Sequence, residues 1–305
     1  MSTKLIEELR SIEGSVEEHK VKLEDFIKNV KNVLILTYSG SGIIPSNVAY
    51  WYLKILKPSI STSMYSVDEF IYHIAPYMRN KADVLGIFSE GQENNAIRFR
   101  DVCVSLGLNH LIITPVLDSR VVTRIRSNNL LTINTSNYLL YVSLLFAKAI
   151  TELAEEKEVL RVKRLLSEVR DFGSVINELY NEYKDAINGI VDAVKSIDEV
   201  MLTYTPTMLS PAYLLFYEIR ARGLGISIVN ATSALQVVQS LTKSNLGLIV
   251  FSTDVESHVI NEVLFKARIK GCRVIDIRLK TDPLTASIYG LFLSKIIIDS
   301  LGRQS

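Results

Sequence analysis

Short apolar runs alternate with amphipathic segments along most of the chain, a pattern typical of an α/β protein. The first clear run is Val33–Leu36, which is apolar at every position. Such a run indicates a strand that is covered on both faces in a parallel sheet. A Ser/Gly turn follows over residues 39–42, and Pro45 stands where the first turn of a helix tolerates a missing N–H. We therefore expect a strand, a turn and a helix over residues 33–57.

The same alternation continues to the end of the chain and defines two halves. A helical pattern over residues 3–30 precedes the first strand. In the first half we expect strands at 33–36, 60–65, 83–88, 111–114 and 130–133, with helices at 45–57, from 67, at 93–106 and at 138–155. In the second half we expect strands at 199–204, 226–229, 247–251 and 273–277, with helices at 209–221, 234–241, 257–270 and 284–301. Charged amphipathic helices over 152–170 and 172–195 join the halves, and their charges are predicted to be solvated faces.

This order of elements predicts the fold class. Parallel neighbouring strands need crossover helices, so alternating strands and helices indicate doubly wound parallel sheets. We expect an α/β protein with two tandem doubly wound domains and parallel five-stranded sheets, the second with four to five strands. The predicted limits are 1–155 for a first domain with its N-terminal helix and 156–305 for a second domain that begins with linker helices.

The two halves carry similar strand ends. Residues 33–38 correspond to 199–204, and both segments end in Thr-Tyr. Phe88-Ser89-Glu90 corresponds in the same way to Phe251-Ser252-Thr253. This correspondence predicts an internal duplication. The alternative is a chance likeness of two α/β units.

Composition and charge limit the classes of partner that we expect the protein to bind. The 305 residues include 34 basic and 33 acidic ones, a net charge of +1, so no overall field attracts nucleic acid or an anionic membrane. The segment before Val33 is short and rich in glutamate, which disfavours a DNA-reading domain. Its charges leave no apolar signal core, and we expect the longest apolar stretches to be far below the ~20 residues that span a bilayer. We expect a cytoplasmic protein with small-molecule partners, no nucleic acid and no membrane.

The two cysteines, Cys103 and Cys272, are predicted to be inert buried thiols. With four scattered histidines they offer no metal site, and we expect neither a metal nor another cofactor.

The turn at Ser39-Gly40-Ser41-Gly42 is the first candidate for chemistry. Hydroxyls and backbone N–H groups at the start of a helix favour a phosphate or a carboxylate. The alternative is that serine and glycine serve only as turn residues. The spacing lacks the G-x-G-x-x-G of dinucleotide sites, which disfavours a nucleotide cofactor.

With these segments in view, the chain resembles the tandem sugar isomerase (SIS) domain proteins. The family includes the isomerase half of glucosamine-fructose-6-phosphate aminotransferase and stand-alone glucosamine-6-phosphate deaminases. The resemblance is carried by LTYSGSGIIPSNVAYW (36–51), Ser66-Val67-Asp68-Glu69-Phe70, Ser89-Glu90-Gly91 and the long helix after Ser136. It implies flavodoxin-like sheets with a ligand at the carboxyl ends of the strands.

The resemblance also implies site residues. Those that would bind a sugar phosphate are Ser39, Gly40, Ser41, Ser89, Glu90, Gln92 and Ser136. In the family, hydroxyls stand where this chain has Glu90 and Glu93, and two carboxylates repel a phosphate. Either Ser89 acts as the donor with the glutamates turned out, or the ligand is an amine or a neutral sugar and Glu90 is its partner.

Glu218, in a segment similar to the family's K-E-I, and Glu69 are the candidates for proton transfer. Glu218 has the alternative of an ordinary exposed helical glutamate. The family's histidine has no counterpart in residues 230–236, and its C-terminal lysine tail has none before Ser305.

Two functions stay open at this point. One is aldose–ketose isomerisation or deamination of a hexose or hexosamine phosphate. The alternative is a non-catalytic or diverged SIS protein that binds a sugar phosphate as a sensor. Because apolar faces on the helices 3–30 and 138–155 exceed what one α/β unit needs, we also expect a homodimer.

Overall fold

The computed structural model describes residues 3–78, 82–115, 123, 125, 129–197, 199–241 and 245–302. The chain divides into two compact units, Ile12–Arg170 and Asp171–Ser305 together with Met1–Ser11. We call them the first and the second unit. The limits 1–155 and 156–305 remain a prediction about separately folding domains.

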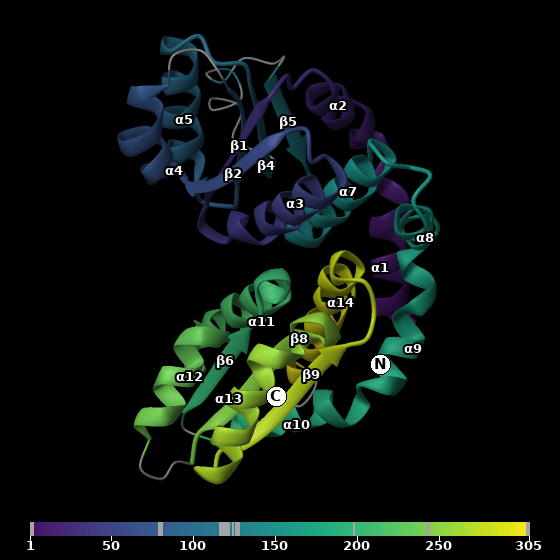
Figure 1. The fold of residues 1–305 in the computed structure, drawn as a ribbon, viewed down its shortest axis with the longest axis vertical. Helices are drawn as coiled ribbons and strands as arrows, with labels where there is room; N and C mark the ends of the chain where they lie inside the picture. Colours follow the sequence, from purple (N-terminus) through teal and green to yellow (C-terminus); the bar gives the residue numbers. More distant parts are fainter. Residues whose placement is uncertain are drawn as a thin grey trace. The chain divides into compact units, whose positions relative to one another are not determined.

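The first unit is built on a five-stranded parallel sheet (Figure 1). Its strand order is β2-β1-β3-β4-β5. The strands are β1 (Val33–Ser39), β2 (Ser61–Ser66), β3 (Asp83–Phe88), β4 (His110–Pro115) and β5 (Leu130–Ile133). The helices are α2 (Glu17–Lys28), α3 (Ile43–Leu56), α4 (Val67–Glu69), α5 (Glu93–Ser105), α7 (Tyr138–Glu152) and α8 (Leu160–Val169). A π-helical turn, Phe70–Ile74, continues α4.

Apolar side chains fill both faces of this sheet, as the unbroken apolar runs predict. Phe99 of α5 packs between Phe70 and Phe88, with ring centroids 5.6 Å from each. On the other face α3 and α7 pack together, with α2 beside α7. Helix α7 is buried along nearly its whole length within this chain, so its apolar surplus gives no support to a dimer interface.

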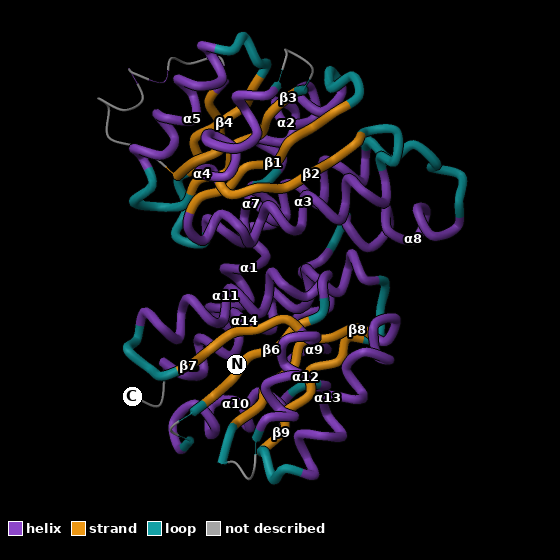
Figure 2. The backbone as a smooth tube through the Cα atoms, turned by 60° about the vertical axis from the view of Figure 1, so that its left-hand side comes forward, coloured by secondary structure: helices purple, strands orange, loops and turns teal. Residues whose placement is uncertain are grey.

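The second unit repeats this architecture with four parallel strands among its described residues, in the order β7-β6-β8-β9 (Figure 2). The strands are β6 (Val200–Tyr204), β7 (Ile226–Asn230), β8 (Gly247–Thr253) and β9 (Arg273–Leu279). The helices are α9 (Ile176–Glu182), α10 (Lys184–Ser196), α11 (Leu209–Ala221), α12 (Ala231–Ser240), α13 (Ser257–Ile269) and α14 (Pro283–Gly302). The prediction of two doubly wound parallel sheets is confirmed, with the smaller sheet in the second half.

Several helices differ from the sequence-based prediction. The helix predicted over 172–195 is divided into a 3-10 turn over Phe172–Val175 and the two helices α9 and α10. The segment 3–30 forms two helices, α1 (Thr3–Ser15) and α2, and the break follows Gly14 and Ser15, which are weaker helix formers than alanine. Helix α8 starts at Leu160, later than expected. Helix α12 starts earlier because the side chain of Asn230 accepts a hydrogen bond from the N–H of Ser233 at 2.8 Å, which caps it.

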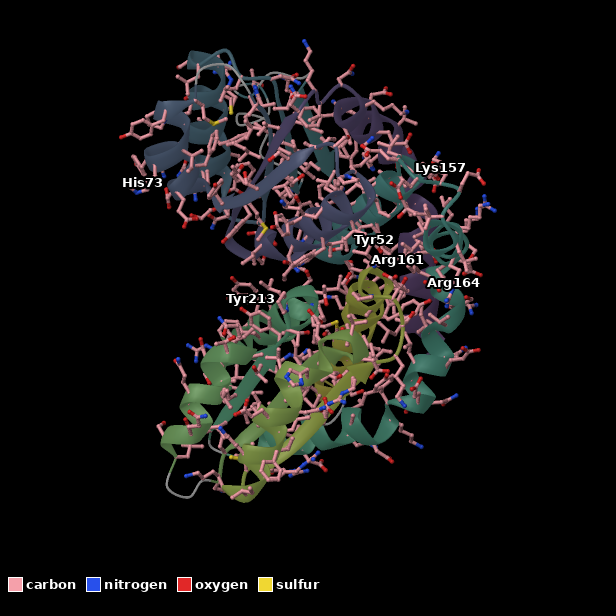
Figure 3. The ribbon with its side chains drawn as sticks, in the orientation of Figure 1. Tyr52, His73, Lys157, Arg161, Arg164 and Tyr213 are labelled. Carbon is pink, nitrogen blue, oxygen red and sulfur yellow. The ribbon has the colours of Figure 1, made fainter. Side chains whose placement is uncertain are left out.

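The charges of α8 lie on its outer face, as predicted. Arg161 and Arg164 are both exposed (Figure 3). Cys103 and Cys272 are buried, as expected, and are not joined in a disulfide, and burial raises the pKa of the Cys103 thiol to about 12.

The length of the longest apolar helix was underestimated from the sequence. Helix α14 has 20 residues and is long and apolar enough to cross a membrane by length and composition, and 78% of that stretch is buried in the structure. It packs on α11, where the hydroxyl of Ser294 donates to the carbonyl of Pro211 at 2.9 Å. These contacts are those of a core helix.

Candidate functional site

The strand order of the first sheet reverses between β1 and β3, and the carboxyl ends of these strands lie side by side. Ser39, the last residue of β1, is paired with Phe88, the last residue of β3. Ligands of doubly wound sheets bind at such a reversal, outside the carboxyl ends of the strands. The predicted Ser39–Gly42 and Ser89–Gln92 turns both begin here, so the structure brings them together.

A closed hydrogen-bond network joins the two turns. The hydroxyl of Ser39 donates to Oε1 of Gln92 at 2.5 Å. The amide nitrogen of Asn95 donates to Ser39 Oγ and to Gln92 Oε1, both at 2.8 Å. The three side chains carry donors and acceptors but no charge. We call Ser39, Gln92 and Asn95 the neutral network.

Gly40 and Ser89 fix the approach of the two turns. Gly40 has a positive φ of 59°, and a Cβ placed there would lie 2.4 Å from Ser89 Oγ. The buried hydroxyl of Ser89 donates to the carbonyl of Ser39 at 3.2 Å. Ser89 therefore holds the turns together, whereas Glu90 is exposed and Ser41 and Glu93 are half-buried.

Arg98 extends the network along α5. It donates to Asn95 Oδ1 at 3.0 Å, to Asp68 Oδ1 at 3.2 Å and to the hydroxyl of Tyr72 at 2.7 Å. Sequence reasoning missed Asn95 and Arg98. The spacing of Gln92, Asn95 and Arg98 was the available signal, because residues three apart share a helix face.

The carboxylate of Glu69 caps its own helix. It accepts hydrogen bonds from the N–H and the hydroxyl of Ser66 at 2.7 and 2.8 Å, while Ser66 Oγ accepts from the N–H of Glu69. These bonds from Ser66 lower the pKa of Glu69. Glu69 follows β2 at the same sheet edge as the neutral network, but a carboxylate that is stabilised as an anion is a weaker base.

Glu218 lies in the third turn of α11. It is nine residues beyond Leu209, the residue that begins the helix next to the end of β6, which corresponds to about 13 Å along the axis. Its Oε1 is 3.7 Å from Nζ of Lys295 on α14. Within the second unit, Glu218 is thus far from the carboxyl edge of the sheet.

Ser136 is exposed in the link between β5 and α7. Strand β4 separates β5 from β3, so Ser136 is not at the strand reversal. Its role as a ligand-binding residue stays a prediction.

The second unit has an equivalent strand reversal between β6 and β8. Tyr38 pairs with Ile87 in the first sheet, and Tyr204 pairs with Phe251 in the second. If the two tyrosines are matched, Ile87 and not Phe88 is equivalent to Phe251. The sequence-based pairing of Phe88 with Phe251 is therefore wrong by one residue.

With this register Ser39 is equivalent to Thr205, and Gln92 to Glu256. The carboxylate of Glu256 accepts hydrogen bonds from the hydroxyls of Thr205, Thr207 and Thr253 at 2.5, 2.8 and 2.9 Å. We call these three hydroxyls the threonine cradle.

Two cavities lie away from both strand reversals. One of about 500 Å³ in the first unit is lined by residues that include Lys148, Glu152 and Lys157. Another of about 730 Å³ in the second unit is lined by residues that include Arg268, Asp276 and Arg278. Burial raises the pKa of Asp276. Neither cavity contains a residue predicted to bind the ligand.

The fold of the tandem SIS proteins consists of two doubly wound units, in each of which two turns meet at the carboxyl edge of its own sheet. This chain has that fold. A protein from Salmonella typhimurium LT2 that is provisionally assigned as a phosphosugar isomerase superposes with a TM-score of 0.70 at 11% identity, over 99% of this chain and 95% of its own.

Two further solved structures show the same likeness. The C-terminal domain of glucosamine-fructose-6-phosphate aminotransferase from Francisella tularensis gives a TM-score of 0.66 at 10% identity, over 98% of this chain and 95% of its own. Glucosamine-6-phosphate deaminase from Thermotoga maritima gives 0.63 at 13% identity, over 98% of this chain and 95% of its own.

Sequence comparison adds little to this structural likeness. No family model matches the chain. One of the subunits of NADH-quinone oxidoreductase from Rickettsia conorii is 31% identical over 119 residues, which is 39% of this chain and 16% of that protein. Because the match spans so small a part of the oxidoreductase subunit, the activity of that protein is not carried over.

Proposed function

We propose that the protein binds a sugar phosphate at the strand reversal of the first unit and acts as a sensor of that metabolite. The neutral network carries this proposal. Ser39, Gln92 and Asn95 place hydroxyl and carboxamide groups together where doubly wound sheets take ligands. Such groups can exchange their mutual hydrogen bonds for bonds to the hydroxyls of a sugar.

The phosphate has a weaker set of partners. Ser41 is half-buried in the turn that leads into α3, and the N–H groups at that helix start favour an anion. Glu93 stands in the first turn of α5 and opposes a nearby phosphate. We therefore expect modest affinity, with the sugar hydroxyls supplying much of the recognition.

The two candidate bases favour binding over catalysis. Glu69 is engaged in a capping box, and Glu218 lies beside Lys295 about two and a half turns along its helix. The likeness to glucosamine-6-phosphate deaminase and other such enzymes supports a sugar phosphate as the ligand class.

Calorimetry with glucosamine 6-phosphate and fructose 6-phosphate tests binding, with the unphosphorylated sugars for comparison. We expect saturable binding of at least one phosphosugar, weakened about tenfold by Ser39→Ala. Ser167→Ala on α8 serves as the control, because that exposed hydroxyl donates to the carbonyl of Arg164 within its own helix. Absence of binding by every phosphosugar tested would overturn the proposal.

Proton exchange tests catalysis in the same samples. We expect no incorporation of deuterium from solvent at C1 or C2 of either sugar phosphate. Incorporation that is lost in Glu69→Gln or Glu218→Gln would instead establish an isomerase or deaminase.

The homodimer and the cytoplasmic location also stay proposals. Both rest on the sequence-based reasoning alone. Sedimentation at several concentrations tests the first, and a single species of 34.3 kDa at high micromolar concentration would contradict it.

A further inference from the structure

The threonine cradle differs from an ordinary turn in the number of donors aimed at one atom. Thr205, Thr207 and Thr253 all donate to the same oxygen, Oε2 of Glu256. The N–H of Thr207 donates to the other oxygen, Oε1, at 3.3 Å. Thr205 and Thr253 are 1% and 0% exposed, so their hydroxyls have little access to water. Four donors from three residues thus converge on one carboxylate.

Convergent hydroxyls and a backbone N–H are the groups that proteins present to a bound oxyanion. The cradle occupies the reversal between β6 and β8, where a doubly wound sheet takes its ligand. Helices α11 and α13 start at Leu209 and Ser257, directly after these turns, and their N-termini favour negative charge. The carboxylate of Glu256 therefore stands where the oxygen atoms of a small anion would be held.

The first unit has a neutral group at the equivalent position. Ser39 donates to the amide oxygen of Gln92 at 2.5 Å, as Thr205 donates to Glu256 at the same distance. An incoming anion displaces a carboxamide without charge repulsion, whereas a carboxylate both fills the cradle and repels the anion. The two strand reversals thus differ in the charge of one side chain, which is the neutral Gln92 in the first unit and Glu256 in the second.

We propose that the second unit contains an oxyanion site for phosphate or a similar tetrahedral anion, and that Glu256 closes it by acting as its internal ligand. The chain then has one open ligand site, in the first unit, and one closed site. The statement about the second unit stands on its own contacts. The statement about the open site rests on the proposed function.

Inorganic phosphate is the probe for the closed site. In the full chain carrying Glu256→Ala, we expect phosphate to bind at one equivalent, at least tenfold more tightly than to the natural chain, with shifts in the methyl NMR signals of Thr205, Thr207 and Thr253. Glu262→Ala is the matched control, because it removes an exposed glutamate of α13 that pairs with Lys266 outside the cradle. A folded Glu256→Ala variant without this gain would overturn the proposal, as would phosphate shifting these threonine signals equally in the natural chain.

A second variant covers the case in which Glu256→Ala does not fold. Glu256→Gln keeps an acceptor for the hydroxyls and removes the charge. We expect phosphate to perturb the threonine methyl signals of this variant at concentrations that leave the natural chain unchanged. Identical phosphate titrations of the two folded proteins would again overturn the proposal.

The reciprocal change tests the open site. Gln92→Glu places a carboxylate beside Ser39, and we expect it to weaken phosphosugar binding at least tenfold. If the natural chain binds no phosphosugar, the proposed function fails, while the phosphate titration of Glu256→Ala still decides the closed site. If the natural chain binds and Gln92→Glu binds equally well, the contrast between the two units is wrong.

Discussion

The hydroxyl of Thr205 lies 2.5 Å from a carboxylate oxygen of Glu256, and the equivalent pair in the first unit, Ser39 and Gln92, has the same separation. The same contact, a hydroxyl that donates across the two turns, is thus present at both strand reversals. Its acceptor is charged in the second unit and neutral in the first. The contact joins the turns after neighbouring strands in each unit. It therefore matters for stability as well as for ligand binding.

Glu256→Ala is expected to destabilise the second unit by about 3 kcal/mol, because hydrogen bonds to a charged group contribute about 1.5–3 kcal/mol each and do not add fully. Hydrogen exchange of amides in β6 and β8 measures the loss locally. Glu262→Ala should cost less than about 1 kcal/mol, since exposed ion pairs contribute little. Equal protection in the two variants would contradict the proposed importance of the cradle.

Gly40→Ala should destabilise the first unit by more than Gly91→Ala. Both glycines have a positive φ, 59° and 76°, and an alanine in such a conformation costs about 1–3 kcal/mol. At Gly40 the added Cβ would also lie 2.4 Å from Ser89 Oγ, whereas nothing lies within 4 Å of one at Gly91. Urea unfolding followed by the fluorescence of Trp51 compares the two variants. Equal losses of unfolding free energy would show that the close approach of Gly40 to Ser89 does not constrain the two turns.

The fold followed from the sequence because its signals are local. Unbroken apolar runs identified central strands such as β1 and β8, and the predicted limits of β3, β5 and α11 agree with the structure. Parallel pairing then followed from the crossover helices. The first residues of α8 and α12 were harder to predict, since charged linkers and capping side chains compete with helix periodicity there.

The site was only partly predictable. The turns at Ser39 and Ser89 were found because Ser and Gly mark strand-to-helix turns, and the structure places them together. The roles of Asn95 and Glu256 depend on which side chains face each other across two strands. Those contacts depend on strand register. The sequence-based pairing of Phe88 with Phe251, continued along the chain, would align Glu256 with Glu93 and not with Gln92.

The capping box at Ser66 and Glu69 should make stability depend on acid pH. Hydrogen bonds from Ser66 lower the pKa of Glu69 below its ordinary value of 4.5, so the folded state favours the ionised carboxylate. The stabilisation is present above pH 4.5 and is lost as the pH falls through the lower folded pKa. Ser66→Ala should cost about 1 kcal/mol at pH 7. Its difference from the natural chain should shrink below pH 4.5 in urea unfolding curves, and a constant difference down to about pH 3 would contradict this assignment.

The contact of Glu218 with Lys295 provides a separate test of whether Glu218 belongs to a ligand site. The two charged atoms are 3.7 Å apart, and Glu218 is partly exposed, so the pair should contribute less than about 1 kcal/mol to stability. A double-mutant cycle of Glu218→Gln and Lys295→Gln in urea unfolding measures this coupling. Because Glu218 lies far along α11 from the carboxyl edge of its own sheet, we expect both variants to bind phosphosugar as the natural chain does. A loss of binding greater than about tenfold in Glu218→Gln, with Lys295→Gln unchanged, would show that this carboxylate contacts the ligand and would return it to the role of candidate base.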